Sequence, residues 1–492
     1  MSESRPVNRS GEYPPRRRRR KRVPKWKRML RKYWPPIRFG LVCLSLILVI
    51  SFAISGIVKG IRNAAQDSQD SLRETEPMES TESPEQIESR AQEVLAKAEN
   101  MAAGFDYLGA IELIESFEYY EDFDFLTAKI PEYENLDKTL VSWPRMDQIT
   151  HVFFHSLIVD TDRCFDGDGD EDGYNQYMTT CDEFWAMLEA MYEKGYILVS
   201  PYDVAYEVQS DAGSYFTYGN IRIPEGRIPF LMSQDDVNYY SYMIGTGDGK
   251  GETPVFADEK GDGFASRIVI GADGYPTCEY MDANGNVATG DYDLVPLLEK
   301  FIQLHPDFSY HGARAILGMT GYEGVFGYRT KPSYENTMGT EAYQREVEAA
   351  KEVAQCLRDH GWILASHSYG HPAYGNIPAE NVAADSDKWE NTVQPIIGDT
   401  DIILYPHGSD ITGTGQYTFD NAKFAALYED GYRYFFNVDS HVYWAQLGAN
   451  YYRAGRRNLD GYRMYYNPNK LADLFDVTEV WDPARPSPVP PI

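Results

Sequence analysis

The most regular pattern in the chain is an alternation of short apolar runs and longer amphipathic runs between residues 142 and 480. The apolar runs are rich in β-branched and aromatic residues, as expected of buried strands. The amphipathic runs place apolar residues at steps of three and four, as expected of helices. The expected strands are Ile149–Ile158, Tyr196–Ser200, Ile228–Met232, Ala313–Gly318, Trp362–Ala365, Ile402–Tyr405 and Tyr434–Val438, and the clearest helices are Cys181–Gly195, Glu341–His360 and Asn421–Gly431. Repeated strand-then-helix order predicts an α/β fold with a parallel sheet, open or closed into a barrel.

This pattern is interrupted between residues 245 and 293. The interruption carries Ala272-Asp-Gly274 and Asn284-Gly285, which are turn signals among β-prone residues. They predict a β-hairpin insertion beside the face on which the strands end. After the domain, the proline-rich tail 481–492 is expected to be disordered or extended.

The residues before the domain have a different composition. Residues 59–88 are polar and rich in Ser, Glu, Gln and Asp, which predicts a disordered stalk because such a segment cannot bury a core. Residues 89–141 have helical periodicity and are similar to a single tetratricopeptide-like hairpin. One repeat is too little for a solenoid, which favours a helical spacer packed on the main domain over an independent peptide-binding module.

Charge divides the chain sharply. The first 38 residues hold 15 Lys and Arg against two acidic residues, whereas the whole chain has a net charge of −29. Residues 39–58 follow as a 20-residue run without a charge, which is about the length that crosses a bilayer core. The basic cluster before this run predicts a cytoplasmic tail at 1–38, an uncleaved transmembrane anchor at 39–58 and an extracytoplasmic body. A cleaved signal peptide or a nucleic-acid-binding arm is the alternative, but a basic arm needs no apolar sequel, so we expect no nucleic acid partner.

Two short polar runs follow two of the expected strands. Ser233-Gln-Asp-Asp236 comes after one, and Ser366-His-Ser-Tyr-Gly-His371 comes after another. In α/β sheets and barrels, ligands bind at the carboxyl ends of the strands. Two imidazoles four residues apart and one carboxylate make a three-ligand set with an open position, as a catalytic divalent metal requires. Asp236, His367 and His371 are therefore the candidate ligands, and Asp235 is left free to act as a base.

These runs resemble the motifs of the polysaccharide deacetylase family, the NodB-homology domain of carbohydrate esterases, over residues 142–476. Ser233–Asp236 stands where the family has Thr-Phe-Asp-Asp, and His367–His371 matches its His-Ser/Thr-x-x-His motif. Leu404-Tyr-Pro-His-Gly408 is similar to the third motif, and Lys194–Pro201 is similar to the usual lead-in.

The resemblance implies a distorted (β/α)7 barrel and a set of site residues. Asp236, His367 and His371 would bind the metal, and Asp235 would be the general base. The backbone N–H of His407 would stabilise the oxyanion, and Asp439 would be the fourth-motif aspartate. Zinc is the expected metal, although Co²⁺, Ni²⁺ or Fe²⁺ would fit the same ligands.

The chain departs from the family pattern at two places. Leu404 stands where many members have an arginine that orients the base, although one branch with an Ala-Tyr-Pro-type motif also lacks it. The last motif, which normally supplies an acid histidine, corresponds to Arg456-Arg-Asn-Leu-Asp-Gly461 and has no histidine. His407 or His441 could replace that acid, or each could be structural or contact substrate. His155, at the end of the first strand, is equally a candidate for substrate contact and for a hydrogen-bonded strand-end residue.

Two weaker signals concern ions and cysteines. Asp168, Asp170 and Asp172 have the spacing of the first half of a calcium loop, but Thr179 stands where a bidentate Glu belongs, which favours a solvated acidic loop over a Ca²⁺ site. The five cysteines do not form a disulfide framework, and only Cys164 and Cys181 are candidates for a bridge.

Together these features predict a membrane-anchored, metal-dependent hydrolase that removes acetyl groups from an extracellular or cell-envelope polysaccharide. The main alternative is a catalytically weak barrel that serves as an anchored glycan-binding protein. A third possibility is an anchored interaction protein whose helical hairpin recruits partners.

Overall fold

The computed structural model describes residues 82–167, 171–210, 213–244, 261–439 and 441–492. The predicted cytoplasmic tail (1–38), membrane anchor (39–58) and most of the stalk (59–88) therefore lie outside the described residues. Within the described part of the chain, no helix is both long enough and apolar enough to span a bilayer.

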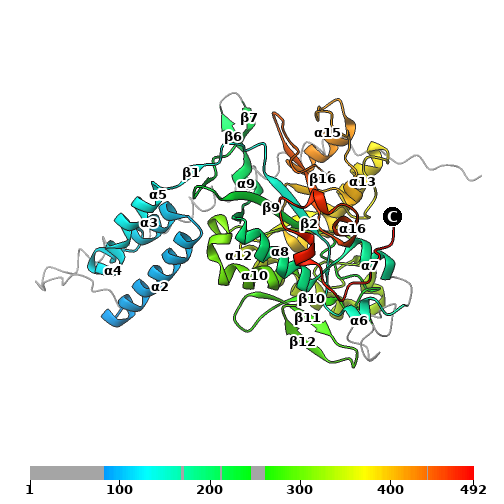
Figure 1. The fold of residues 1–492 in the computed structure, drawn as a ribbon, viewed down its shortest axis with the longest axis horizontal. Helices are drawn as coiled ribbons and strands as arrows, with labels where there is room; N and C mark the ends of the chain where they lie inside the picture. The colour runs from blue at the N-terminus through cyan, green and yellow to red at the C-terminus, as the bar shows by residue number, and fades with distance from the viewer. Residues whose placement is uncertain (1–81, 168–170, 211–212, 245–260, 440) are drawn as a thin grey trace, which may run out of the picture. The chain divides into compact units, whose positions relative to one another are not determined.

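Seven parallel strands form a closed barrel, as the (β/α)7 prediction requires (Figure 1). In order around the ring they are β13 (Ile316–Met319), β14 (Ile363–Ser366), β15 (Ile402–Leu404), β16 (Tyr434–Val438), β18 (Tyr452–Asn458), β2 (Thr150–Phe154) and β9 (Ile228–Gln234). The ring closes because β13 pairs in parallel with both β14 and β9. The prediction of an α/β fold is confirmed, and the sheet is the closed form rather than the open one.

The strands of the structure differ from those expected from the sequence in three ways. The expected strand at 196–200 is β5 (Tyr196–Leu198), which pairs with the first half of β9 outside the ring. The expected first strand ends at Phe154 and resumes as the short β3 (Leu157–Ile158), which pairs with β4 (Thr179–Thr180). The sequence pattern did not predict β18, because its charged residues hide its strand character.

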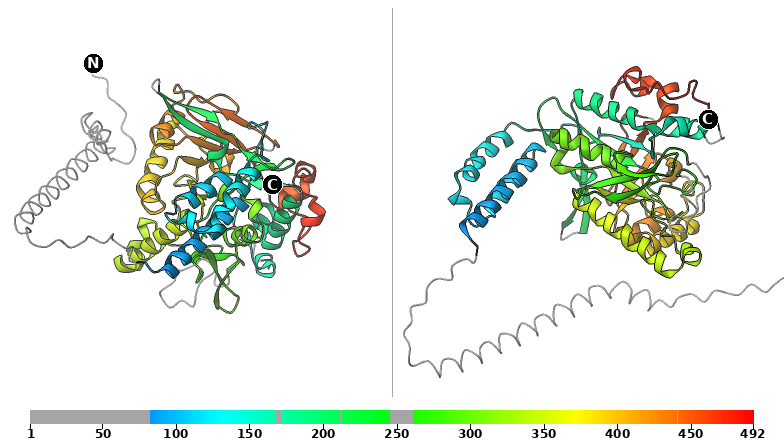
Figure 2. Two further views of the ribbon diagram at one scale, coloured as in Figure 1. Left: turned by 90° about the vertical axis from the view of Figure 1, so that its left-hand side faces the viewer. Right: turned by 90° about the horizontal axis from the view of Figure 1, so that it is seen from below.

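Helices lie around the outside of the barrel (Figures 1 and 2). They are α6 (Thr161–Cys164), α7 (Glu171–Tyr177), α8 (Cys181–Glu193), α9 (Pro201–Val204), α10 (Leu294–Leu304), α11 (Glu335–Met338), α12 (Thr340–Asp359), α13 (Ala379–Thr392), α14 (Gln394–Ile397), α15 (Ala422–Glu429), α16 (Gly461–Tyr466) and α17 (Val477–Val480). Short 3-10 turns occur at η2 (Pro306–Phe308), η3 (Tyr310–Gly312), η4 (Pro332–Tyr334), η5 (Pro406–Gly408) and η6 (Pro468–Lys470), and minor strands at β1 (Val141–Ser142), β6 (Ala205–Ser210), β7 (Gly213–Tyr218), β8 (Arg222–Ile223) and β17 (Ala445–Leu447). Helix α8 starts where the sequence predicts, because Thr180 and Glu183 form a capping box.

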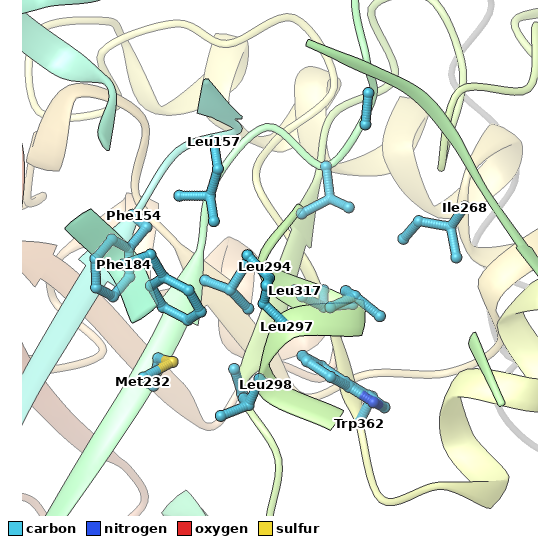
Figure 3. Close-up of a cluster of buried hydrophobic side chains, with 14 of the residues drawn as sticks. Phe154, Leu157, Phe184, Met232, Ile268, Leu294, Leu297, Leu298, Leu317 and Trp362 are labelled. Carbon is cyan, nitrogen blue, oxygen red and sulfur yellow. The ribbon is translucent and has the colours of Figure 1, made fainter. Parts of the chain in front are cut away.

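Side chains alternate across each barrel strand and divide the core into two parts. In β9, Phe230 and Met232 belong to the layer between barrel and helices, and Leu231 belongs to the barrel interior. Figure 3 shows part of the outer layer, where Phe184 of α8 and Leu294 of α10 lie near Met232. The interior cluster includes Leu231, Ile316, Ala365, Ile402, Leu404, Tyr434, Phe436, Tyr452 and Ala454. Because this interior is filled with side chains, chemistry is confined to the rim where the strands end.

The segment before the barrel is helical and has its own small core. It contains α2 (Pro84–Ala103), α3 (Tyr107–Glu115), η1 (Tyr120–Asp122), α4 (Asp124–Thr127) and α5 (Lys129–Asp137). Helix α2 begins at Pro84, inside the stretch assigned to the stalk, because Ser83 and Gln86 form a capping box there. The end of α2 meets the barrel domain through a hydrogen bond from the His311 N–H to the Gly104 carbonyl oxygen (2.9 Å).

The predicted β-hairpin insertion is a three-stranded antiparallel sheet. Its strands are β10 (Ala265–Ile270), β11 (Pro276–Met281) and β12 (Val287–Gly290). Both turn signals are correct, since Gly274 and Gly285 lie in the two connections with positive φ. The prediction was one strand short because β12 is mostly exposed and lacks an alternating pattern.

The proline-rich tail, expected to be disordered or extended, contains no helix or strand and is held against the domain by contacts. Arg485 is buried and forms an ion pair with the equally buried Glu183 of α8. The Tyr466 hydroxyl donates to the Val489 carbonyl oxygen (2.8 Å). Composition alone did not show that this arginine has a buried carboxylate to bind.

Candidate metal centre and active site

The carboxyl ends of β9 and β14 bring the two polar runs to the same rim of the barrel. Only β13 separates these strands, and a Cβ on Gly318 of β13 would stand 2.8 Å from the Leu404 Cδ1 and 3.4 Å from the His367 Cβ, so glycine lets Leu404 pack closely here. Asp236 (φ 57°) and His371 (φ 54°) adopt the left-handed backbone region, which non-glycine residues rarely use. Such backbone geometry is concentrated at functional sites, where surrounding structure holds it in place.

Asp236, His367 and His371 form the cluster that the sequence predicts. One ligand atom from each lies within 4.8 Å of the others. The Nε2 atoms of the two histidines are 3.2 Å apart, and His371 Nε2 is 3.8 Å from an Asp236 carboxylate oxygen. These separations suit three ligands that converge on one small cation.

The surroundings of the three ligands fix which atoms face the centre. His367 Nδ1 donates to the Leu404 carbonyl oxygen (2.8 Å), which leaves Nε2 as the free nitrogen. The Tyr240 hydroxyl donates to Asp236 (2.6 Å). Burial opposes ionisation of Asp236, but the neighbouring His367 and His371 outweigh burial and lower its pKa. Burial, opposed by Asp236, lowers the pKa of His371, so its imidazole is neutral at pH 7, as a metal ligand requires. The donor set therefore fits a divalent metal.

Asp235 is bound by an arginine that the sequence analysis did not identify. Arg456 of β18 contacts both carboxylate oxygens of Asp235, at 2.6 and 2.9 Å, and both side chains are buried. Burial raises the pKa of Asp235, but Arg456 and then His367 outweigh it and hold that pKa below its usual range. Leu404, the last residue of β15, stands where the resemblance places an orienting arginine, and the arginine that binds Asp235 comes from β18 instead.

The position of Arg456 follows from strand alternation. Tyr452 and Ala454 of β18 face the barrel interior, so Arg456, two residues further, faces it as well. Arg457 points the other way and pairs with Asp473 (2.8 Å). If residues 452–458 had been taken as a strand, its two-residue alternation would have placed Arg456 on the same side as Tyr452, toward Asp235.

His407 lies on the rim beside His371. Its Nε2 donates to the His371 carbonyl oxygen (3.2 Å), and the two rings are 4.4 Å apart. Burial, followed by the neighbouring His371, lowers the pKa of His407, so its imidazole is neutral at pH 7. The His407 N–H is the first backbone donor of the turn η5, because Pro406 has none, and first donors have no partner within their own turn. This arrangement is compatible with the predicted oxyanion role.

A pocket of about 490 Å³ opens in front of these residues. Its lining consists of Phe153, His155, Tyr177, Met178, Asp235, Asp236, His367, His371, His407, Gly408, Val438, Asn458 and Asp460. A larger pocket of about 850 Å³ lies beside α16 and α17, but no cluster of metal-binding side chains within the described residues lines it. The chemistry therefore belongs to the smaller pocket, which no described residue of the β10–β12 sheet lines.

His155 and Asp460 line the same pocket and follow two neighbouring strands, β2 and β18. Strand β2 pairs with β18 in a register that sets Phe153 opposite Asn458, so both residues lie two positions beyond that pair. His155 Nδ1 donates to the Tyr177 carbonyl oxygen (3.2 Å), which leaves Nε2 available. Burial raises the pKa of Asp460, which also caps α16 by accepting from the Arg463 N–H (2.7 Å). His155 thus lies next to the end of β18, where the last motif of the resemblance would place a histidine.

Two other candidates lie away from the pocket lining. Asp439 follows β16 and accepts from both the backbone N–H and the ring of His441, and neither side chain is among the described residues that line the pocket. Its catalytic role stays a prediction.

The calcium and disulfide candidates are only partly covered. Asp168 and Asp170 lie outside the described residues, and Asp172 lies in the first turn of α7. Thr179 is buried and donates to the Leu459 carbonyl oxygen (2.6 Å). Cys164 and Cys181 are free thiols, so the candidate bridge is not formed.

Comparisons with known proteins are sparse. No protein-family model matches the chain, and no curated protein matches it. Among solved structures, the Streptococcus pyogenes deacetylase PplD in complex with acetate is similar, with 14% sequence identity and a TM-score of 0.35. That match covers 68% of this chain and 99% of PplD. A likeness this low does not assign an activity to this chain.

Proposed function

We propose that this protein is a metal-dependent hydrolase that removes acetyl groups from an extracellular or cell-envelope polysaccharide. The observation that carries the proposal is the pairing of a three-ligand centre with a buried Asp235–Arg456 ion pair in one pocket. The resemblance of the motifs around Asp235 and His367 to those of polysaccharide deacetylases supplies the substrate class.

Asp236, His367 and His371 would hold the metal, probed first as zinc. A divalent metal in such a site supplies an activated water and polarises the acyl carbonyl group. Asp235 would serve as the general base, because it remains ionised beside Arg456 and lies 3.9 Å from the His367 Nε2. Arg456 holds both carboxylate oxygens of Asp235 in one orientation. The His407 N–H donates to the developing oxyanion.

The proton for the leaving group comes from His155 in this proposal. Its Nε2 is left available by the Nδ1 bond to Tyr177, and it lines the same pocket as the ligands. Asp460, which follows the adjacent strand end, lines the same pocket as His155. His407 is a weaker donor candidate, because its Nε2 is bonded to the His371 carbonyl oxygen.

The proposed location rests on the sequence alone. Residues 39–58 would anchor the chain in the cell membrane, with the N-terminus in the cytoplasm and the barrel outside. This orientation presents the pocket to an acetylated envelope polysaccharide.

The proposal is tested with the full-length protein by metal analysis and by acetate release from a panel of acetylated glycans. Asp235→Asn should lower acetate release at least a hundredfold while metal content stays the same, because the base is lost and the ligands are kept. Asp307→Asn, which changes a partly exposed ion pair outside the site, is the matched control. A wild-type protein that carries no metal and releases no acetate would favour the glycan-binding alternative.

A further inference from the structure

Two buried polar side chains in the barrel interior are not used by the proposed mechanism. They are His151 of β2 and Ser233 of β9, which are 1% and 0% exposed. The His151 Nε2 lies 3.0 Å from the Ser233 hydroxyl oxygen. Neither side chain lines the pocket, and the His151 Nδ1 has no hydrogen-bond partner among the described residues. A buried polar atom without a partner costs free energy, so its presence calls for a physical explanation.

The order of the strands explains why these side chains meet Arg456. Strand β2 lies between β18 and β9 in the ring and pairs with both. Side chains two residues apart on a strand face the same side, so Ser233 faces the barrel interior with Leu231. The His151 ring meets the ring of the interior residue Phe436 edge-on, with centroids 4.7 Å apart. Three neighbouring strands therefore direct His151, Ser233 and Arg456 into the same part of the interior.

The direction of the hydrogen bonds follows from what each group can donate. Arg456 has only donors, and its Nη1 donates to the Ser233 hydroxyl oxygen (3.2 Å) and to Asp235 (2.6 Å). Burial, followed by Arg456 and opposed by Asp235, lowers the pKa of His151 well below its usual value, so the ring is neutral at pH 7. If the Ser233 hydroxyl donates to Nε2, the ring proton lies on Nδ1, and only that proton lacks a partner. The other tautomer leaves two groups unpaired, the Ser233 proton and the Nδ1 lone pair, so the chain of hydrogen bonds runs from Arg456 through Ser233 to His151.

This chain restricts the guanidinium group of Arg456. Its Nη2 donates to Asp235 (2.9 Å), and its Nε has no hydrogen-bond partner among the described residues. Within that part of the chain, the Ser233 hydroxyl is thus the only hydrogen-bond partner of the guanidinium apart from Asp235 itself. Without this third bond, the guanidinium and the carboxylate would be able to turn together. The Ser233 oxygen in turn faces Arg456 only while its proton is directed to His151.

We propose that Ser233 and His151 are positioning residues that hold Arg456, and through it the carboxylate of Asp235, in the orientation that proton transfer requires. This inference rests on the proposed function and adds to it two residues that act through Arg456. A small error in the orientation of a base slows the chemical step and leaves substrate binding intact. The unpaired Nδ1 of His151 follows from the need to place an acceptor for Ser233 among mostly apolar side chains.

The first test measures kcat, KM and metal content of the full-length protein, with the tetramer of N-acetylglucosamine and an acetylated xylan tetramer as substrates. Ser233→Ala and His151→Leu break the chain, whereas Ser233→Thr keeps the hydroxyl and His151→Gln keeps an acceptor. We expect kcat to fall about tenfold in the two breaking variants, with KM and metal content unchanged, and to stay within about threefold of wild type in the two conservative ones. The double variant Ser233→Ala/His151→Leu should lose no more than either single variant, because both residues act through one chain. Tyr452→Phe is the matched control, since it removes another buried interior hydroxyl that has no hydrogen-bond partner among the described residues.

Imidazole NMR separates this proposal from the proposed function. In the full-length protein with isotope-labelled histidine, it reports which ring nitrogen of His151 carries the proton, and the signals missing in His151→Gln assign the ring. We expect the proton on Nδ1 at pH 7, and a shift of the Nε2 resonance in Ser233→Ala but not in Tyr452→Phe. This pattern in a protein that releases no acetate would support the hydrogen-bond chain and contradict the proposed function alone.

Two results would overturn the proposal. One is a His151 proton on Nε2, which the wild-type spectrum shows even if a variant fails to fold. The other is a wild-type kcat in both Ser233→Ala and His151→Leu, because Arg456 would then be held without the chain.

Discussion

Replacing Arg456 by Ala isolates the most deeply buried charge interaction of the site. The guanidinium of Arg456 is fully buried, and it contacts Asp235 twice and the Ser233 hydroxyl once, at 3.2 Å. It also lies 4.5 Å from the centroid of the Phe153 ring. The substitution removes all of these contacts and leaves the Asp235 carboxylate buried without its partner.

The magnitude follows from that burial. Removal of one partner of a buried ion pair costs about 3–5 kcal/mol, because the remaining charge loses its compensation. In wild type the pKa of Asp235 is depressed, so its ionised form stabilises the fold above the unfolded-state pKa of about 3.9, and that contribution is lost as pH falls. In the variant, burial acts unopposed by Arg456 and raises the pKa. The difference in stability should therefore grow as pH rises from about 4 to 7.

The assay is urea unfolding with excess chelator, so that metal affinity does not contribute. Arg457→Ala is the matched control, since Arg457 pairs with Asp473, whose side chain is 30% exposed, and should cost less. A double-mutant cycle with Asp235→Asn should give a coupling energy of about 2 kcal/mol or more, at the upper end of coupled neighbours. A cost for Arg456→Ala below about 1 kcal/mol at pH 7, or no coupling to Asp235, would refute the reasoning.

Two further substitutions test the structure outside the pocket. Burial raises the pKa of Asp430 to about 6, so the free energy of unfolding falls as pH rises from about 4 to 6. After allowance for solvent screening, Asp430→Asn should raise that free energy by about 1 kcal/mol at pH 7.5 and leave it unchanged at pH 4. Thermal melts at both pH values measure the difference. Arg485→Met should destabilise the fold by about 3–5 kcal/mol in urea unfolding, because Glu183 then stays buried without its partner. The control Arg145→Met removes an exposed pair and should change stability by less than about 0.5 kcal/mol. Equal effects of the two arginine variants would contradict the burial of the tail.

The α/β class could be predicted because most barrel strands are buried on both faces. The runs Ile228–Met232 and Ile402–Tyr405 are almost wholly apolar and match β9 and β15 within a few residues. By contrast, β18 has the sequence Tyr-Arg-Ala-Gly-Arg-Arg-Asn and was not recognised as a strand. All of its residues except Asn458 are buried, and each of its three arginines pairs with a carboxylate from another segment. Such partners are invisible to local periodicity.

The metal cluster could be predicted because its residues follow strands directly. Asp236 is the second residue after β9, and His367 is the first residue after β14. Because parallel strands end at the same rim, their positions along the sequence are enough to bring the two side chains together. The register of the rim could not be predicted in the same way. Whether an aspartate lines the pocket depends on the path of the backbone after its strand. Asp460, which caps α16, lines the pocket, and Asp439 does not.

A closed barrel explains why roles can be filled from unexpected strands. Interior positions at one level of the ring point toward one another, whichever strand supplies them. Arg456 of β18 thus reaches Asp235, which follows β9, past the single strand β2 that separates β18 from β9. The resemblance places an orienting arginine at the end of β15 instead. By the same geometry, His155 after β2 lies beside the end of β18, where the motif order leaves no histidine. The order of residues along the chain is therefore a weaker guide to this site than the side of the barrel to which each residue points.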